Sequence, residues 1–404
     1  MLVSEKMRDA VNKGSLIRAM FEDGIKLKNQ YGADNVFDFS LGNPDLSPPT
    51  EFAETLSEVI KENKPGVHGY MPNAGLEEVR KAFADYVTEQ NKEEFGETFV
   101  ADNVVLTVGA AGGINCVLKA VLDPGDEVMV LAPYFVEYGF YADNHAGVIV
   151  QVETDRKFRP DPEALAKSIT PKTRALIVNT PNNPTGAVYD AGELKAIGDV
   201  LTLANQKLKR PIVLIADEPY KKIVFDGKKA PSIFASYPYS ISVTSFSKDL
   251  SIPGERLGYV TISPKTDGDA EELFLAVTLA NRILGSVNAP ALVQRTAARL
   301  LRKNADLSVY EKRSKLLSEA LADMGYDLTP PEGTFYLFPK CPIESDSDFT
   351  VYLRQELILA VPGTGFKRSG HFRLSLCADE EHIRKSLNRF KVARENAMNK
   401  KPLF

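Results

Sequence analysis

The sequence between residues 104 and 262 contains seven short apolar runs, most of them separated by segments with helical patterning. Short apolar runs are typical of buried strands, and residues 212–216 contain no polar side chain at all. Strands that alternate with helices favour a parallel sheet covered by helices. We therefore predict an α/β fold with a seven-stranded, mostly parallel sheet flanked by helices. The runs are residues 104–108, 127–131, 148–152, 175–178, 212–216, 241–244 and 257–262.

The length of 404 residues favours one large domain and one smaller domain. After about residue 290 the pattern changes to helices with short strands, which is typical of an α+β domain. We expect an N-terminal arm with part of the small domain at 1–48, a large domain at 49–290 and a small C-terminal domain at 291–404. Helices are expected at 15–31, 50–62, 76–90, 114–122, 291–317 (broken or bent), 349–356 and 380–400, and short strands at 37–41, 334–338 and 371–376.

Charge and composition argue against several classes of function. The net charge of -5 disfavours nucleic acid or an anionic membrane as the main partner. The N-terminus lacks the apolar core of a signal peptide, and no apolar run could span a bilayer, so we expect a cytoplasmic protein. The three cysteines lack metal-ligand spacing and there are only four histidines, so we expect free thiols and no metal site.

Polar or small residues follow each apolar run, and in a parallel sheet ligands bind beyond the carboxyl ends of the strands. After 104–108, Gly109, Ala110 and Ala111 precede a helix whose backbone amides could approach an anion. The spacing is neither a dinucleotide fingerprint nor a P-loop, and a tight helix start would explain the glycines equally well. Phe135 could stack on a flat cofactor, although core packing is the commoner role of an isolated aromatic residue.

The next strands end in an amide and a carboxylate. Residues 175–178 lead into a turn in which Asn183 could face a ligand or could simply form the turn. Asp217 ends a buried strand, where a carboxylate is costly unless a cation or a hydrogen-bond donor pairs with it. Metal binding by Asp217 and Glu218 is conceivable, but no neighbouring motif supports it.

Lys248 follows residues 241–244 among small hydroxyl residues, where a solvated surface lysine is the ordinary interpretation. One chemistry, however, uses all of these groups together. Pyridoxal phosphate needs a lysine for its Schiff base and an acidic partner for its pyridine nitrogen. It also needs an anion site for its phosphate and an aromatic face for its ring.

The order of these parts resembles the class I and II aminotransferases, pyridoxal-phosphate enzymes of fold type I, over nearly the whole chain. The resemblance is carried by Asn183-Pro184-Thr185-Gly186, Asp217-x-x-Tyr220 and Ser245-x-x-Lys248 followed by Arg256. Each piece alone is weak, but the set in this order is specific. It implies an enzyme that moves the amino group of an L-amino acid to a 2-oxo acid by a ping-pong mechanism.

By this resemblance Lys248 would hold the cofactor and move the substrate's α-proton, because a lysine of lowered pKa is both nucleophile and base. Asp217 would keep the pyridine nitrogen protonated, while Tyr220 and Asn183 would hydrogen-bond the cofactor's phenolic oxygen. The other cofactor contacts implied are Gly109, Ala110, Ala111, Ser245, Ser247 and Arg256, mainly around the phosphate, and Phe135 against the ring.

Arg373 would clamp the substrate α-carboxylate, because a guanidinium group binds it through two hydrogen bonds, and Gly42 would approach the same group through its backbone. Tyr70 matches a tyrosine that the family contributes to the neighbouring subunit's phosphate site, which implies a homodimer with shared active sites. A lysine that reads side-chain carboxylates in some relatives is replaced by Ala111. Arg282 has the spacing of a reader supplied by the partner subunit, although a surface arginine on a helix is the commoner interpretation.

Substrate identity depends on these last positions. We expect glutamate and 2-oxoglutarate as one substrate pair and aspartate as the first choice of amino donor, with alanine or an aromatic amino acid as alternatives. A C–S lyase would use the same lysine and carboxylate, so the sequence does not separate it from a transferase. A non-enzymatic effector-binding domain of a bacterial regulator would follow a winged helix-turn-helix, whereas only a short arm precedes Gly42.

Overall fold

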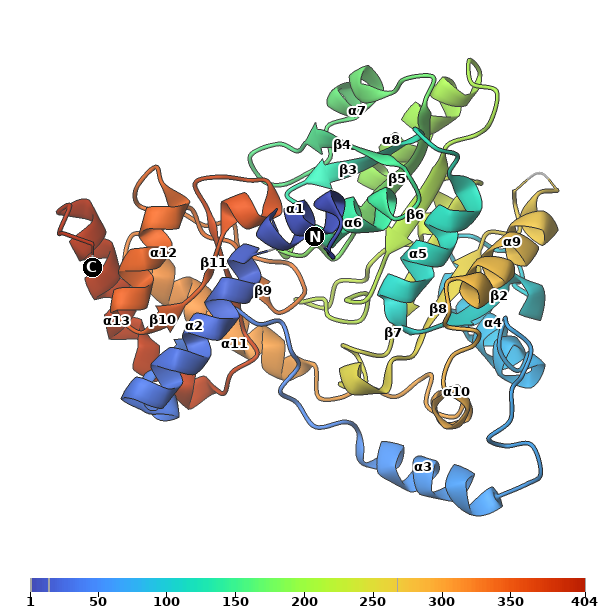
Figure 1. Ribbon diagram of the computed structural model, residues 1–404, viewed down its shortest axis with the longest axis horizontal. Helices are drawn as coiled ribbons and strands as arrows, with labels where there is room; N and C mark the ends of the chain where they lie inside the picture. The colour runs from blue at the N-terminus through green and yellow to red at the C-terminus, as the bar shows by residue number, and fades with distance from the viewer. Residues whose placement is uncertain (1, 14, 267, 404) are drawn as a thin grey trace.

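The computed structural model describes residues 2–13, 15–266 and 268–403 and contains a central seven-stranded sheet flanked by helices (Figure 1). The strand order is β2-β8-β7-β6-β5-β3-β4, and only β8 runs antiparallel to its neighbours. The predicted seven-stranded, mostly parallel sheet is therefore confirmed. The strands are β2 (Val104–Thr107), β3 (Glu127–Ala132), β4 (Val148–Glu153), β5 (Thr173–Asn179), β6 (Val213–Asp217), β7 (Ser240–Ser245) and β8 (Gly258–Ile262).

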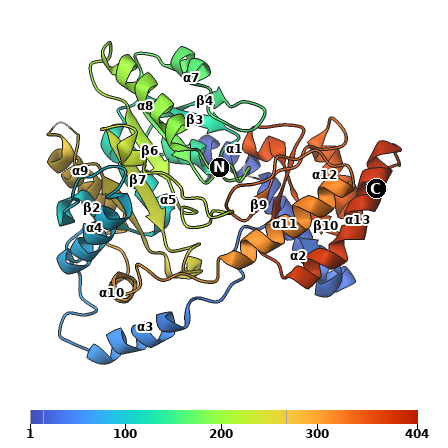
Figure 2. The same ribbon diagram turned by 180° about the vertical axis from the view of Figure 1, so that it is seen from behind.

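The central strands are buried on both faces, which explains their continuous apolar sequences. Every residue of β5, β6 and β8 is buried. Because successive side chains of a strand point to opposite faces, Leu214 and Ile215 belong to two different hydrophobic clusters. The cluster of Leu214 includes side chains of α4 (Glu77–Asn91), α7 (Pro162–Ser168) and α8 (Ala191–Asn205). The cluster of Ile215 includes side chains of α5 (Gly109–Val121), α6 (Glu137–Asp143) and α9 (Ala270–Ile283). Helices therefore cover both faces of the sheet (Figures 1 and 2).

Helix α5 begins at Gly109, five residues earlier than the expected start at residue 114. The glycine-rich segment therefore forms the first turns of the helix instead of a loop before it. A Cβ atom on Gly113 would come within 2.7 Å of the Val243 side chain, so a glycine here allows α5 to pack closely against β7.

A second group of elements lies beside the large sheet and has its own hydrophobic cluster, which includes Phe39, Tyr310 and Phe390 (Figure 1). The antiparallel strands β11 (Val361–Pro362), β12 (Phe372–Ser375) and β9 (Tyr336–Leu337) form one small sheet, and β1 (Phe37–Asp38) pairs with β10 (Ile358–Leu359). The helices of this group are α2 (Ser15–Tyr31), α11 (Ser308–Asp323), α12 (Asp346–Gln355) and α13 (Glu380–Met398).

The helix expected at residues 291–317 is broken, as anticipated, into α10 (Ala291–Ala298) and α11. In the break, the backbone N–H of Ala305 donates to the carbonyl of Asp249 at 2.8 Å, a contact that draws this segment away from a continuous helix. Helix α10 packs against α3 (Thr50–Glu62) and α4. The domain boundaries at residues 49 and 291 remain a prediction.

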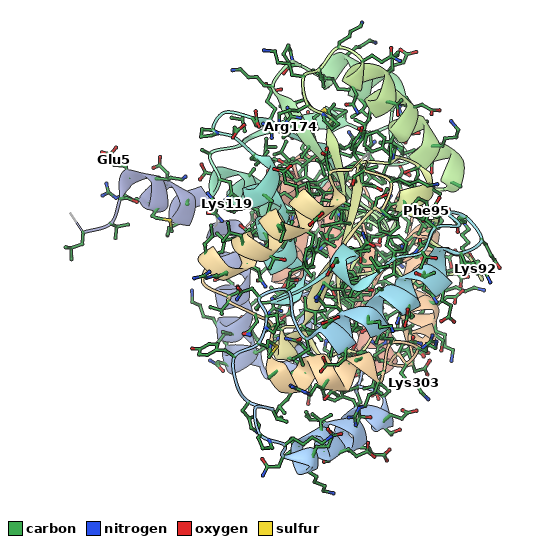
Figure 3. The ribbon with its side chains drawn as sticks, turned by 90° about the vertical axis from the view of Figure 1, so that its right-hand side faces the viewer. Glu5, Lys92, Phe95, Lys119, Arg174 and Lys303 are labelled. Carbon is green, nitrogen blue, oxygen red and sulfur yellow. The ribbon has the colours of Figure 1, made fainter. Side chains whose placement is uncertain are left out.

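The N-terminal helix α1 (Glu5–Lys13) projects from the rest of the chain, as the position of Glu5 in Figure 3 shows. Its apolar side chains Met7 and Val11 are more than half exposed. Within the described ranges, no helix is both long enough and apolar enough to cross a membrane.

Candidate active site

A cavity of about 400 Å³ lies at the carboxyl ends of β5, β6 and β7, where the sequence places the candidate site. It brings together residues that are far apart in the chain, from the segment after β1 to strand β12. The predicted residues that line it are Gly42, Ala110, Ala111, Phe135, Asn183, Asp217, Tyr220, Ser245, Ser247, Lys248, Arg256 and Arg373.

Lys248 lies just beyond β7, with its Nζ atom donating a hydrogen bond to the Gly42 carbonyl at 2.8 Å. Burial lowers the pKa of Lys248 to about 8, and the guanidinium groups of Arg373 and Arg256 act in the same direction. An ordinary lysine has a pKa near 10.4, so Lys248 is uncharged far more often at neutral pH. An uncharged amine can attack an aldehyde carbon and can accept a proton.

Asp217 is the last residue of β6, and its side chain is buried. The Tyr138 hydroxyl donates to Oδ2 at 2.5 Å, whereas Oδ1 has no hydrogen-bond partner among the described residues. Burial raises the pKa of Asp217 to about 7; the Tyr138 hydrogen bond lowers it, and the nearby Glu218 raises it. A buried carboxylate oxygen without a partner is costly, and a cationic N–H group would satisfy it.

Glu218 faces the opposite side of the sheet from Asp217. Its Oε2 atom accepts a hydrogen bond from Ser242, and its Oε1 atom lies 2.9 Å from Lys221 Nζ. Its backbone N–H donates to the Val243 carbonyl, which continues the ladder between β6 and β7. Glu218 therefore lines a different cavity, of about 230 Å³, and is already paired.

Asn183 and Tyr220 lie beyond the carboxyl ends of β5 and β6, where neighbouring polar groups hold them in place. The Asn179 side chain donates to the Asp217 carbonyl at 2.8 Å and accepts from the Asn183 backbone N–H at 2.7 Å. The hydroxyls of Tyr220 and Tyr336 share a hydrogen bond of 3.3 Å. Asn179 thus joins the ends of two strands to the turn that carries Asn183.

Arg373 lies on β12 and is buried in the wall of the cavity. Its Nη1 donates to Asn183 Oδ1 at 3.1 Å and its Nη2 to the Ser40 carbonyl at 2.7 Å, while Nε has no hydrogen-bond partner in the described part of the chain. The rings of Tyr336 and Phe366 lie against its guanidinium group, with centroids 4.5 and 4.7 Å away. No carboxylate of the described chain forms an ion pair with it, so a ligand carboxylate would neutralise a buried charge.

An anion site is formed where α5 begins. The Arg256 guanidinium lies so close to Gly109 that a Cβ atom there would be 2.8 Å from Arg256 Nη2, and Gly109 has a φ of +69°, which favours glycine. A Cβ on Gly258 of β8 would be 2.6 Å from the carbonyl carbon of Gly109 and 2.9 Å from the backbone nitrogen of Ala110. Two glycines therefore allow α5 to begin close beside β8, and its N-terminus adds a positive potential to that of Arg256. Ser245 and Ser247 line the cavity nearby.

Three predicted residues do not line this cavity. Gly109 lies next to the Arg256 guanidinium at the start of α5 but is not among the lining residues. Tyr70 is 93% exposed in the loop before α4, and Arg282 is exposed in the last turn of α9. A residue that acts in a partner subunit's site would lie outside the cavity of its own chain, and this is true of Tyr70 and Arg282.

Several lining residues were not predicted from the sequence. Tyr138 and Tyr141 come from α6, and Tyr336 comes from β9. Asn179 ends β5 and could have been found by the same end-of-strand argument that identified Asp217.

These residues fit pyridoxal phosphate. The unpartnered Oδ1 of Asp217 suits a protonated ring nitrogen, and Lys248 is a lysine that can lose its proton near neutral pH. Arg256 and the start of α5 suit the phosphate.

Comparison with known proteins gives the same result. Residues 34–390 match the family described as aminotransferase class I and II. The aspartate/prephenate aminotransferase of Thermus thermophilus is 33% identical over 94% of this chain and 95% of the relative, and the aspartate aminotransferase of Pyrococcus horikoshii is 30% identical over 95% of each. The crystal structure of an amino transferase from Eubacterium rectale has a TM-score of 0.93 with 36% identity, covering 98% of this chain and 99% of that one. The chain therefore belongs to the class I and II aminotransferases, which are enzymes of fold type I that depend on pyridoxal phosphate.

Proposed function

We propose that this aminotransferase uses glutamate and 2-oxoglutarate as one substrate pair and aspartate as the preferred second amino donor, in a ping-pong reaction. The observation that carries the proposal is the buried Arg373, which forms no ion pair with the described residues and shares one cavity with Lys248. Amino acids and 2-oxo acids have in common the carboxylate that this guanidinium group would bind. The choice of aspartate is supported by relatives that are named aspartate or aspartate/prephenate aminotransferases.

Each side chain of the cavity would have a separate task. When bound, pyridoxal phosphate supplies an electron sink for the carbon that loses its proton. Asp217 would accept a hydrogen bond from the protonated ring nitrogen, and Arg373 would orient the substrate carboxylate. The Lys248 amine would then remove the α-proton of the amino donor, and in the second half-reaction it would give a proton to the α-carbon of the 2-oxo acid. Tyr220 and Asn183 would hold the edge of the ring.

An absorbance experiment tests this function. The purified protein with pyridoxal phosphate should show a visible absorption band that disappears when aspartate is added and returns when 2-oxoglutarate is added. Release of ammonia and a 2-oxo acid from the amino donor alone, with no need for a second 2-oxo acid, would instead indicate a lyase.

Arg373→Lys should raise the KM of both the amino donor and the 2-oxo acid by about 10- to 100-fold, with a smaller effect on kcat. A lysine keeps the charge but loses the two-pronged geometry that a carboxylate needs. Arg384→Lys is a matched control, because Arg384 is an exposed residue on α13 that pairs with Glu380. An Arg373→Lys enzyme with wild-type KM values would contradict this assignment.

The rate at which the apoprotein attaches pyridoxal phosphate should depend on pH through Lys248. Only the uncharged amine reacts, and its pKa is lowered to about 8 by burial. The rate should therefore rise about tenfold per pH unit on the acidic side of the pKa and level off above it. A rate that still climbs steeply between about pH 9 and 10 would mean that Lys248 titrates like an ordinary lysine.

We further propose a homodimer with shared active sites. Helix α9 exposes Leu275, Leu279 and Ile283 one turn apart, and α1 exposes Met7 and Val11. Such apolar stripes on the surface mark a contact with another protein. Tyr70 and Arg282 are exposed on the same chain, which suits residues that act in the site of a partner.

In this dimer Arg282 would bind the side-chain carboxylate of aspartate or glutamate. Arg282→Ala should raise the KM of these two substrates by about 10-fold or more while leaving the KM of an aromatic donor nearly unchanged. The aromatic donor is an internal control for folding and dimerisation. If the KM of aspartate and glutamate stays at the wild-type value, Arg282 is not the reader.

One observation favours an aromatic donor as the alternative. The cations that line the cavity in this chain are Lys248, Arg256 and Arg373, and each has another proposed task. An aromatic-amino-acid aminotransferase of Thermococcus litoralis is 28% identical over 91% of this chain.

We also propose a cytoplasmic location, because Cys116, Cys341 and Cys377 are free thiols.

A further inference from the structure

We propose that Tyr138 is a positioning residue that holds the Asp217 carboxylate, so that Oδ2 is occupied and Oδ1 remains available for the ring nitrogen of the cofactor. The inference rests on the proposed role of Asp217 and adds a residue that neither the motifs nor the comparisons identify. Tyr138 lies on α6, three residues after Phe135, and is 1% exposed.

The contact between Tyr138 and Asp217 is short and its geometry is fixed. The Tyr138 hydroxyl lies 2.5 Å from Asp217 Oδ2. Its ring is parallel to that of Tyr134, with centroids 6.4 Å apart, and perpendicular to that of Phe135, with centroids 5.8 Å apart. Rings packed on two sides leave the hydroxyl little freedom, so it can determine the rotation of the carboxylate.

The surroundings of Tyr138 keep its hydroxyl group protonated, so that it donates a hydrogen bond to Asp217. Burial raises the pKa of Tyr138, and the charge of Asp217 raises it further, so the phenol keeps its proton. The other groups that interact with Asp217 are the carboxylate of Glu218 and the hydroxyls of Tyr141 and Tyr220.

Tyr138 therefore stabilises the ionised form of Asp217 in a site that otherwise disfavours it. Burial raises the pKa of Asp217 and the Glu218 charge adds to this, whereas the Tyr138 hydrogen bond opposes both. No cation within the described ranges forms an ion pair with Asp217. Without the hydroxyl, the carboxyl group would be protonated over a wider pH range and both of its oxygens would lack a fixed partner.

Removing the hydroxyl alone tests the inference. Tyr138→Phe should raise the Kd of pyridoxal phosphate, measured by titration of the apoprotein, on the order of 10- to 100-fold, as expected for a lost hydrogen bond to a charged group. It should also move the pH at which cofactor affinity falls on acidification to a higher value. Tyr134→Phe is the matched control, because it removes the hydroxyl of the parallel ring and should leave both quantities unchanged.

A double variant separates positioning from packing. If Tyr138 acts through Asp217, then Tyr138→Phe combined with Asp217→Ala, which leaves no oxygen for Tyr138 to hold, should bind the cofactor as weakly as Asp217→Ala alone. A Tyr138→Phe protein with the wild-type Kd and pH profile would overturn the inference. The inference would also fail if Tyr134→Phe lost as much cofactor affinity and melting temperature as Tyr138→Phe does. Wild-type protein that does not bind pyridoxal phosphate would overturn the proposed function together with this inference.

Discussion

Lys248→Ala is expected to lower the turnover of aspartate with 2-oxoglutarate by at least about 10⁴-fold. The variant loses the amine that would attach to the cofactor and the base that would move the α-proton, and the described residues that line the cavity include no second lysine. Asp217 and Arg256 remain, so the protein should still bind pyridoxal phosphate non-covalently, and its absorption band should differ from that of the wild type.

Lys265→Ala is a suitable control for this variant, because Lys265 lies near the surface of the same part of the chain and pairs with Glu97 at 3.2 Å. It should keep wild-type turnover. Steady-state rates of both variants, together with their melting temperatures, decide the outcome. A Lys248→Ala enzyme that turned over within tenfold of the wild type would show that another group transfers the proton.

Asp217→Asn is expected to lower kcat on the order of 10³-fold. Asparagine has nearly the same shape and can still accept a hydrogen bond from Tyr138, but it carries no charge. In the proposed arrangement the ring nitrogen of the cofactor would then lose the anion that would keep it protonated, and the ring would withdraw electrons less strongly. The main loss should be in kcat, because Arg373, the proposed site for the substrate carboxylate, is unchanged.

Glu218→Gln provides the matched comparison. It removes the neighbouring carboxylate, which faces Ser242 and Lys221 on the other side of the sheet. This variant should lose stability, because Lys221 loses its partner, but should keep most of its turnover. If the two variants lost kcat equally, the effect would come from disturbing β6 and not from the charge of Asp217.

Much of the large sheet could be predicted because buried parallel strands consist mainly of apolar residues. The run at 212–216 predicts β6 to within one residue. The same logic located Asp217, Asn183 and Lys248, because ligands bind where such strands end. The order of the strands could not be predicted, since the antiparallel position of β8 between β2 and β7 depends on pairing between distant segments.

Other parts of the site depend on tertiary packing. Helix α6 contains Tyr138, Phe140 and Tyr141, and the local sequence does not indicate which ring lies next to Asp217. Tyr336 belongs to a two-residue strand of the small sheet, and its position in the cavity depends on how that sheet packs against the large one. The sequence predicts too late a start for α5 because glycines indicate a turn, whereas here they allow close packing against β7.

The arrangement of Asp217 and Glu218 has a consequence for how this enzyme can change. The register pairs Asp217 with Asn179 of β5 and with Val243 of β7. Because strand side chains alternate, deleting or inserting a single residue within β6 would exchange the two carboxylates between the faces of the sheet. After a deletion, Glu218 would occupy the position that Asp217 now holds in the cavity, and Asp217 would take the buried position of Ala216 on the opposite face. Point substitutions in β6 can be absorbed by repacking, but a shift of one residue would change which acid lies in the proposed cofactor site.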